Sequence, residues 1–173
     1  MLRYAVLLAL FSAAFACEAF PNNTQATFNW WQCYEGPIKF YNGTPEDAAG
    51  NYEYPIKLNS PLLIKGYIDN EGHVYNDVTI DIRLWEWDNV FGCRWDEINT
   101  FGLLNNMPGC KNGIPCPIKM GKQWIILKLD FSKFGAIIGL LKNNAAYQIQ
   151  LTMKDKASSD KTCIVAQGRA LTH

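Results

Sequence analysis

Strict alternation of apolar and polar residues is the feature that most constrains the fold of this chain. It occurs in three stretches, residues 78–85, 124–131 and 147–154. Successive side chains of an extended strand point to opposite faces, so each stretch predicts a strand with one apolar face. Four more strands are expected at 28–33, 38–41, 62–68 and 163–171. The pattern predicts an all-β fold, an immunoglobulin-like β-sandwich of two antiparallel sheets packed face to face.

The apolar faces of the predicted strands define the expected interior. Its inward-pointing residues are Ile64, Ile68, Val78, Ile80, Ile82, Leu84, Ile125, Leu127, Leu129, Phe131, Tyr147, Ile149, Leu151 and Met153. A register error of one residue would invert this set on any one strand.

Two apolar stretches do not alternate. Residues 85–107 are rich in Trp, Phe and Leu, and we expect a short helix at 95–101. Residues 134–141 carry apolar side chains at helical spacing, although Gly135 and Gly139 weaken that prediction by about 1 kcal/mol each. The apolar residues expected at the mouth of the interior or against a membrane are Trp85, Trp87, Phe91, Trp95, Phe101, Leu103, Phe134, Ile137, Ile138 and Leu141.

This apolar surplus has two interpretations. Either the side chains fill an ordinary core, or the two sheets splay around a cavity that holds acyl chains. Burying one methylene gains about 0.8 kcal/mol, so a sixteen-carbon chain would gain roughly 12 kcal/mol before ordering costs. No polar group is needed to bind such a ligand.

The first nineteen residues have the layout of a secretory signal peptide, with a basic start and a short apolar run. Cleavage is expected after Ala16 or Ala19, which leaves residues 20–173 as one domain, secreted or lysosomal. Two sequons, at Asn22 and Asn42, predict N-linked glycosylation on that route. No stretch of 18 apolar residues is present.

Six cysteines suit an oxidising compartment. Cys110 and Cys116 lie in a Gly- and Pro-containing loop, which predicts a local bridge. A bridge from Cys33 to Cys163 would close a loop of roughly 130 residues, worth about 4–5 kcal/mol in the chain-entropy model. Cys93 is then left over. It is free, or it pairs with Cys17 if cleavage follows Ala16, or it joins two chains.

The charged residues indicate little chemistry. Sixteen Lys and Arg balance sixteen Asp and Glu, which argues against a nucleic-acid partner. Neither His73 nor His173 stands in a nucleophile–His–acid pattern, and the cysteine spacing is not that of a zinc site. We therefore predict no enzyme, no metal and no cofactor.

An acid pair of a glycoside hydrolase is the rival chemistry. The acids that could form it are Glu86, Asp88, Asp96 and Glu97. Solvated loop charges explain the same residues more simply.

The cysteine loop carries a family resemblance. Residues 109–119 read Gly-Cys-Lys-Asn-Gly-Ile-Pro-Cys-Pro-Ile-Lys, followed by Gly121, Lys122 and a predicted strand. This arrangement resembles the ML lipid-recognition family. Residues 28–33 look like the opening strand of that family, and residues 155–163 like the segment of its last Cys, so the likeness covers about residues 26–171.

The resemblance implies an immunoglobulin-like sandwich with lipid between its sheets. It also implies the bridges Cys33–Cys163 and Cys110–Cys116. The ligand expected first is a phospholipid or glycolipid, with a sterol as the alternative. The protein would transfer lipid at a membrane surface, or present it to a lipid hydrolase or a receptor, as a lipid-dependent co-receptor does. The Trp-rich stretch 84–101 replaces the proline-rich segment of the sterol carriers in this family.

Overall fold

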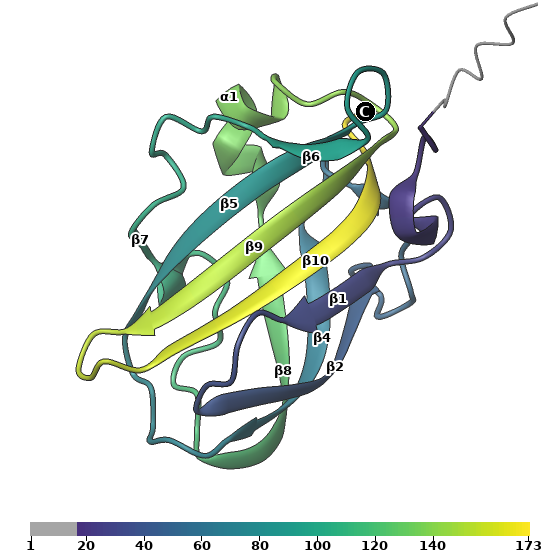
Figure 1. Cartoon of the computed structure of the whole chain (residues 1–173). Coiled ribbons are helices and arrows are strands. Elements are labelled where there is room, and N and C mark those ends of the chain that lie inside the picture. Colours follow the sequence, from purple (N-terminus) through teal and green to yellow (C-terminus); the bar gives the residue numbers. More distant parts are fainter. Residues whose placement is uncertain (1–16) are drawn as a thin grey trace, which may run out of the picture.

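The computed structural model describes residues 17–173, which form two β-sheets that face each other (Figure 1). Most of the expected signal peptide, residues 1–16, lies outside the described residues. A short 3₁₀ turn, η1 (Pro21–Asn23), precedes the first strand. No helix in the described part of the chain is both long enough and apolar enough to cross a membrane.

The larger sheet has the strand order β1–β10–β9–β5–β6. Its strands are β1 (Asn29–Gln32), β5 (Val78–Asp88), β6 (Arg94–Glu97), β9 (Ala145–Asp155) and β10 (Lys161–Leu171). These neighbours are antiparallel. Two short strands attach to this sheet. β3 (Ile56–Lys57) pairs in parallel with β10, and β7 (Met107–Pro108) pairs with β5.

The smaller sheet consists of β2 (Ile38–Glu46), β4 (Leu62–Asn70) and β8 (Gly121–Leu129), in that order and antiparallel. The alternating stretches thus form β5, β8 and β9, and the expected sandwich of two sheets is confirmed. β2 continues well past the predicted 38–41, and a bulge interrupts its register with β4 between Phe40 and Asn42.

The expected helix at 95–101 is wrong. Residues Arg94–Glu97 form β6, which pairs with the end of β5 in the register Trp87↔Trp95. Pairing with an open sheet edge satisfies the backbone groups of this segment, so tertiary context overrides a local pattern. The helical spacing at 134–141 does correspond to a helix, because η3 (Phe131–Phe134) leads into α1 (Gly135–Ile138).

Three disulfides connect the described chain. Cys33–Cys163 joins the end of β1 to β10, and Cys110–Cys116 closes the loop that contains η2 (Gly109–Lys111). Cys17–Cys93 ties the N-terminal segment to the β5–β6 hairpin. That pairing is the alternative in which cleavage follows Ala16. Among residues 17–173, none of these bridges joins one sheet to the other.

The space between the sheets has two different ends. At the end that holds the β9–β10 turn, the side chains pack closely around Ile38, Ile68, Tyr75 and Val78, each at most 1% exposed. We call this the closed end. The opposite end carries η3, α1 and the β5–β6 hairpin (Figure 1), and its apolar side chains are mostly only partly buried. We call this the cavity end.

Candidate functional site: an apolar cavity between the sheets

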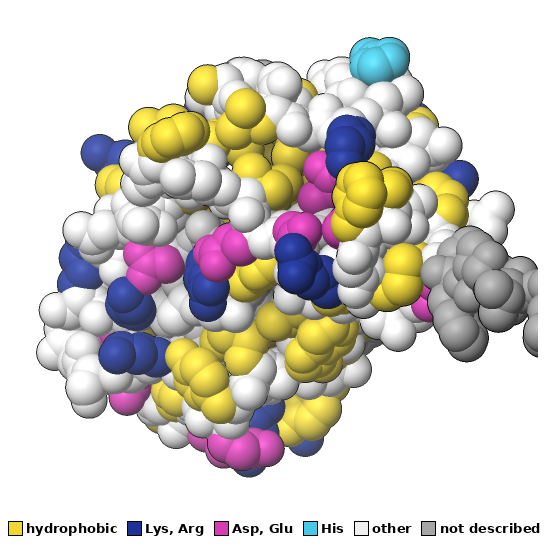
Figure 2. All heavy atoms as spheres, turned by 45° about the horizontal axis from the view of Figure 1, so that its top comes forward, with side chains coloured by type: hydrophobic (Ala, Val, Ile, Leu, Met, Phe, Trp, Pro, Cys, Tyr) yellow, Lys and Arg dark blue, Asp and Glu magenta, His cyan; other side chains and the backbone are white. Residues whose placement is uncertain are grey.

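The inner faces of the two sheets enclose a cavity of about 370 Å³ at the cavity end. Figure 2 turns this end toward the viewer and shows hydrophobic side chains in a depression between the surface segments. Its walls are almost entirely apolar because the inward positions of four strands converge there. The strand residues concerned are Leu62 and Ile64 of β4, Ile80, Ile82 and Leu84 of β5, Ile125, Leu127 and Leu129 of β8, and Tyr147, Ile149 and Leu151 of β9.

Most of the inward residues predicted from alternation line this cavity. They are Ile64, Ile80, Ile82, Leu84, Ile125, Leu127, Leu129, Phe131, Tyr147, Ile149 and Leu151. Ile68, Val78 and Met153 point inward as expected but belong to the packed core of the closed end. The alternation thus identifies the inner face, whereas the position along the strand decides whether a residue meets the void.

The residues predicted for the cavity mouth fall into two groups. Phe134, Ile137, Ile138 and Leu141, from the η3–α1 segment, line the cavity. Trp85, Trp87, Phe91, Trp95, Phe101 and Leu103 do not. The reason is that β5 continues to Asp88 and pairs with β6, which carries these Trp residues away from the opening.

The second group lies on the outer surface near the β5–β6 hairpin. The rings of Trp87 and Trp95 meet edge to face with centroids 5.4 Å apart, and Trp87 Nε1 donates to the carbonyl of Glu18 at 2.7 Å. The guanidinium of Arg83 lies 4.8 Å from the Trp85 ring centroid. Phe91 and Phe101 are 93% and 76% exposed. These side chains are therefore available to a surface outside the molecule.

Several cavity residues were missed by the sequence analysis. They are Phe28, Trp30, Phe40, Ile56, Leu58, Leu104, Met107 and Ile164. Phe28 and Trp30 stand two apart in a predicted strand, so the same alternation could have identified them. Ile56 and Leu58 lie in or beside β3, which has no periodic pattern in the sequence because it is only two residues long.

Tyr147 brings a hydroxyl group to the lining of this mostly apolar interior. The Tyr147 hydroxyl donates to the backbone carbonyl of Lys142 at 2.8 Å, and burial raises the pKa of Tyr147 above its ordinary value. The hydroxyl therefore stays neutral, and its hydrogen-bond donor is already used. The lysines along the boundary of the cavity, Lys111, Lys128 and Lys133, are solvent-exposed. The arrangement suits an apolar ligand and offers no nucleophile–base pair.

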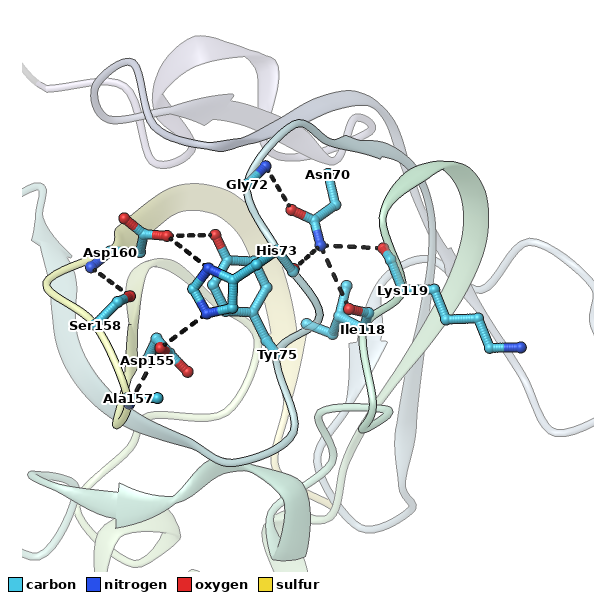
Figure 3. Close-up of polar contacts among 10 residues, drawn as sticks. All are labelled: Asn70, Gly72, His73, Tyr75, Ile118, Lys119, Asp155, Ala157, Ser158 and Asp160. Atoms are coloured by element: carbon cyan, nitrogen blue, oxygen red, sulfur yellow. Dashed lines mark hydrogen bonds and ion pairs between the residues drawn. The ribbon is translucent and has the colours of Figure 1, made fainter.

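A second polar cluster lies at the closed end (Figure 3). His73 stands between two carboxylates, with Nε2 3.2 Å from Asp155 Oδ2 and Nδ1 3.4 Å from Asp160 Oδ2. The Tyr75 hydroxyl donates to Asp160 Oδ2 at 2.8 Å. Both ring nitrogens of His73 thus face acids, and neither faces a serine or cysteine. The cluster joins the β4–β5 loop to the β9–β10 turn as a structural link rather than a catalytic triad.

The pKa values of the Asp155 carboxyl and the Tyr75 hydroxyl reflect these contacts. Burial by itself would raise the pKa of Asp155, but hydrogen bonds from Ser158, His73 and the Ala157 backbone outweigh burial and lower it. Burial and the neighbouring Asp160 carboxylate raise the pKa of the Tyr75 hydroxyl. Asp155 is therefore ionised and Tyr75 neutral at ordinary pH.

The acids considered for a hydrolase each have a local partner. Glu97 pairs with Arg83 at 2.6 Å and Asp96 with Arg94 at 2.7 Å, while Glu86 pairs with Lys142. Asp88 accepts hydrogen bonds from the backbone of Val90 and Phe91. None of these four carboxylates lines the cavity.

Comparison with known proteins gives likenesses of fold only. No protein-family model and no curated protein sequence matches the chain. Among solved structures, the chain is similar to a Niemann-Pick type C2 protein from Japanese carpenter ant, with 12% identity and a TM-score of 0.46 over 82% of this chain and 98% of that one. It is also similar to the C-terminal domain of Wzt, with 11% identity and a TM-score of 0.41 over 84% of this chain and 78% of that one.

Chicken MD-1 complexed with lipid IVa is a third solved structure with a similar fold. Its identity is 10% and its TM-score 0.34, over 81% of this chain and 86% of that one. At these values the assignment of this chain to the two-sheet sandwich class rests on its own strand pairing.

Proposed function

We propose that this chain is a secreted or lysosomal lipid-binding protein that holds the acyl chains of a phospholipid or glycolipid between its two sheets. It transfers or presents that lipid without chemical change. The observation that carries the proposal is the apolar cavity of about 370 Å³ between the inner faces of β4, β5, β8 and β9. The sequence resemblance of residues 109–119 to the ML lipid-recognition family supports the same function.

The cavity has the size and chemistry of a ligand site. Small-molecule sites occupy roughly 300–1,000 Å³ and are lined mainly by apolar side chains. An empty apolar void of this size costs stability, because its lining lacks contact partners. An acyl chain would supply those contacts and gain about 0.8 kcal/mol for each methylene withdrawn from water.

Exposed apolar side chains on the surface of the molecule support exchange of lipid at a membrane surface. Phe91 at the tip of the β5–β6 hairpin, Phe101 and Leu103 before β7, and Leu140 after α1 are all exposed. The hairpin and α1 stand at the same end of the molecule (Figure 1). Aromatic and aliphatic side chains partition into the membrane interface, so this end would face the bilayer while α1 and η3 move to admit a chain.

The test begins with native mass spectrometry of protein secreted by a eukaryotic host, with lipid analysis of its organic extract. Co-purifying phospholipid or glycolipid is the expected result, and sterol would indicate the alternative ligand. In a transfer assay between vesicles, Ile149→Trp should reduce lipid uptake at least tenfold, because the indole would occupy the cavity that Ile149 lines.

Ile126→Trp provides the matched control. Ile126 is half exposed on β8 and does not line the cavity, so the same substitution there should leave uptake unchanged. Equal loss in both variants, or a wild-type protein that neither carries nor takes up any lipid, would overturn the proposal.

A further inference from the structure

The outer face of the smaller sheet carries a row of three aromatic rings. Tyr41 of β2 and Tyr67 of β4 have ring centroids 6.1 Å apart, and Tyr67 and Trp124 of β8 have centroids 5.0 Å apart. Tyr41 is 53% exposed and Trp124 is 56% exposed. We call these three residues the aromatic row. It crosses all three strands of the sheet and is open to solvent.

The aromatic row points away from the cavity. Tyr67 and Trp124 are directly paired across β4 and β8, so their side chains share one face. Their chain neighbours Ile68 and Ile125 are buried in the interior. The proposed lipid site therefore does not use these rings.

The predicted glycosylation site lies within this row. Asn42, of the sequon Asn42-Gly43-Thr44, is exposed and is paired directly with Tyr67, which places its side chain on the face of the rings. Asn42 also borders the cavity opening. The bulge in β2 falls at Tyr41, so Tyr41 and Asn42 together oppose the single residue Tyr67. The sequon is thus held in an extended strand with the aromatic row immediately next to its acceptor.

The two sequons differ in the hydrogen bonding of the acceptor nitrogen. Asn42 Oδ1 accepts from the backbone N–H of Gly43 at 2.8 Å, and within residues 17–173 its Nδ2 makes no hydrogen bond. The other sequon differs in this respect, because Asn22 Nδ2 donates to Gln167 Oε1 at 2.8 Å across the fold. The two sequons therefore form a natural comparison between an acceptor beside the aromatic row and one held against β10.

We propose that Asn42 carries an N-linked glycan whose first sugars pack on Tyr67 and Trp124. Sugar rings present flat C–H faces to which exposed aromatic rings offer a large apolar area at little entropic cost. The attachment point fixes the sugars next to the rings, so packing needs no separate binding event. The glycan also covers β2, an edge strand of its sheet to which the Gln32 side chain of β1 bonds only at the backbone of Ile38 and Phe40. The proposal depends on passage through the secretory route and not on the lipid function.

The first measurement is glycopeptide mass spectrometry of the protein secreted by a eukaryotic host, comparing wild type with Asn42→Gln and Asn22→Gln. We expect occupancy at Asn42 that Asn42→Gln removes and Asn22→Gln leaves intact. An unmodified Asn42 in secreted protein would overturn the proposal, whether or not that protein carries lipid.

The second measurement tests packing. NMR of protein bearing ¹³C-labelled sugars should show contacts between the first N-acetylglucosamine and the Trp124 ring. The glycan should raise the midpoint of thermal unfolding by a few degrees relative to Asn42→Gln, and this gain should vanish in a Trp124→Ser background. Asn22→Gln in both backgrounds is the control, and it should change the midpoint equally with and without Trp124. An unchanged gain in Trp124→Ser, or a freely mobile first sugar, would contradict the packing.

Discussion

The closed end and the cavity end are built from the same strands but have different interiors. Ile68 and Ile64 lie on the same face of β4, four residues apart. Ile68 is fully buried, whereas Ile64 borders the void. On β5, Val78 and Leu84 differ in the same way. The apolar character of the inner face is therefore constant along each strand, and something else decides where the cavity forms.

The loops at each end make this difference. At the closed end, Tyr75 and Ile118 come from two loops that exchange backbone hydrogen bonds of 3.1 and 2.9 Å and place both side chains in the core. They fill the gap between the sheets. At the cavity end, η3 and α1 cover the gap with side chains that are mostly only partly buried. The comparison teaches that loop side chains, rather than strand faces, distinguish a filled core from a cavity.

Truncating an inward side chain should give the largest difference in stability loss between the closed end and the cavity end. Ile68→Ala creates a cavity in this closely packed region, so it should lower the free energy of unfolding by about 2–5 kcal/mol. Ile64→Ala enlarges an existing void that already lacks contacts, and its cost should be about 1 kcal/mol. Urea unfolding of the lipid-free protein measures both. Equal losses would mean that the two ends are equally packed.

Enlarging a side chain should also cost more stability at the closed end than at the cavity end, but the difference should be smaller than for truncation. Val78→Phe forces a ring into a packed site, where a Cβ on Gly109 would already lie 2.7 Å from Val78 Cγ2, and should cost about 1–3 kcal/mol. Leu84→Phe on the same strand has the cavity to expand into, so its cost should stay below about 1 kcal/mol. Thermal unfolding of the two variants distinguishes these outcomes. A larger loss in Leu84→Phe would show that the cavity collapses in solution.

The smallest expected effect is the loss of stability at low pH that Asp155 causes at the closed end. The pKa of Asp155 is lowered in the folded protein, so below about pH 4 the unfolded chain binds more protons at this site. The stability from Asp155 is present above the unfolded pKa and is lost as the pH falls through the folded one. Asp155→Asn should therefore cost about 1–2 kcal/mol at pH 6 and flatten the decline between pH 5 and pH 3. Urea titrations at these pH values measure the slope, and an identical decline in the variant would assign it to other acids.

Sequence pattern predicted the parts of this fold that depend on burial of one strand face. The alternation at 78–85, 124–131 and 147–154 corresponds to β5, β8 and β9. It could not predict that β2 continues through Asn42, Gly43 and Pro45, because those residues favour turns and only pairing with β4 holds them extended. β6 was misassigned for the same reason, since an edge strand acquires its form from its neighbour.

The sequence predicted which strand residues point inward, but it did not predict which of them line the cavity. Alternation indicates which residues point inward, but Ile64 and Ile68 have the same pattern and only one meets the cavity. The distance between sheets depends on loop packing, which has no periodicity. The partner of Cys93 was likewise undetermined, because spacing gives no information on which distant segments meet.

The disulfides have a consequence for how the cavity responds to its contents. Cys33–Cys163 links β1 to β10 within the larger sheet, Cys17–Cys93 ties the N-terminal segment to the β5–β6 hairpin, and Cys110–Cys116 closes only its own loop. Within residues 17–173, the separation of the two sheets is thus set by side-chain contact and loop connections, with no covalent clamp across the interior. The volume at the cavity end is then an equilibrium quantity rather than a fixed dimension. A bulkier occupant would therefore be accommodated by separation of the sheets at the cavity end, where side chains are only partly buried, rather than at the packed closed end.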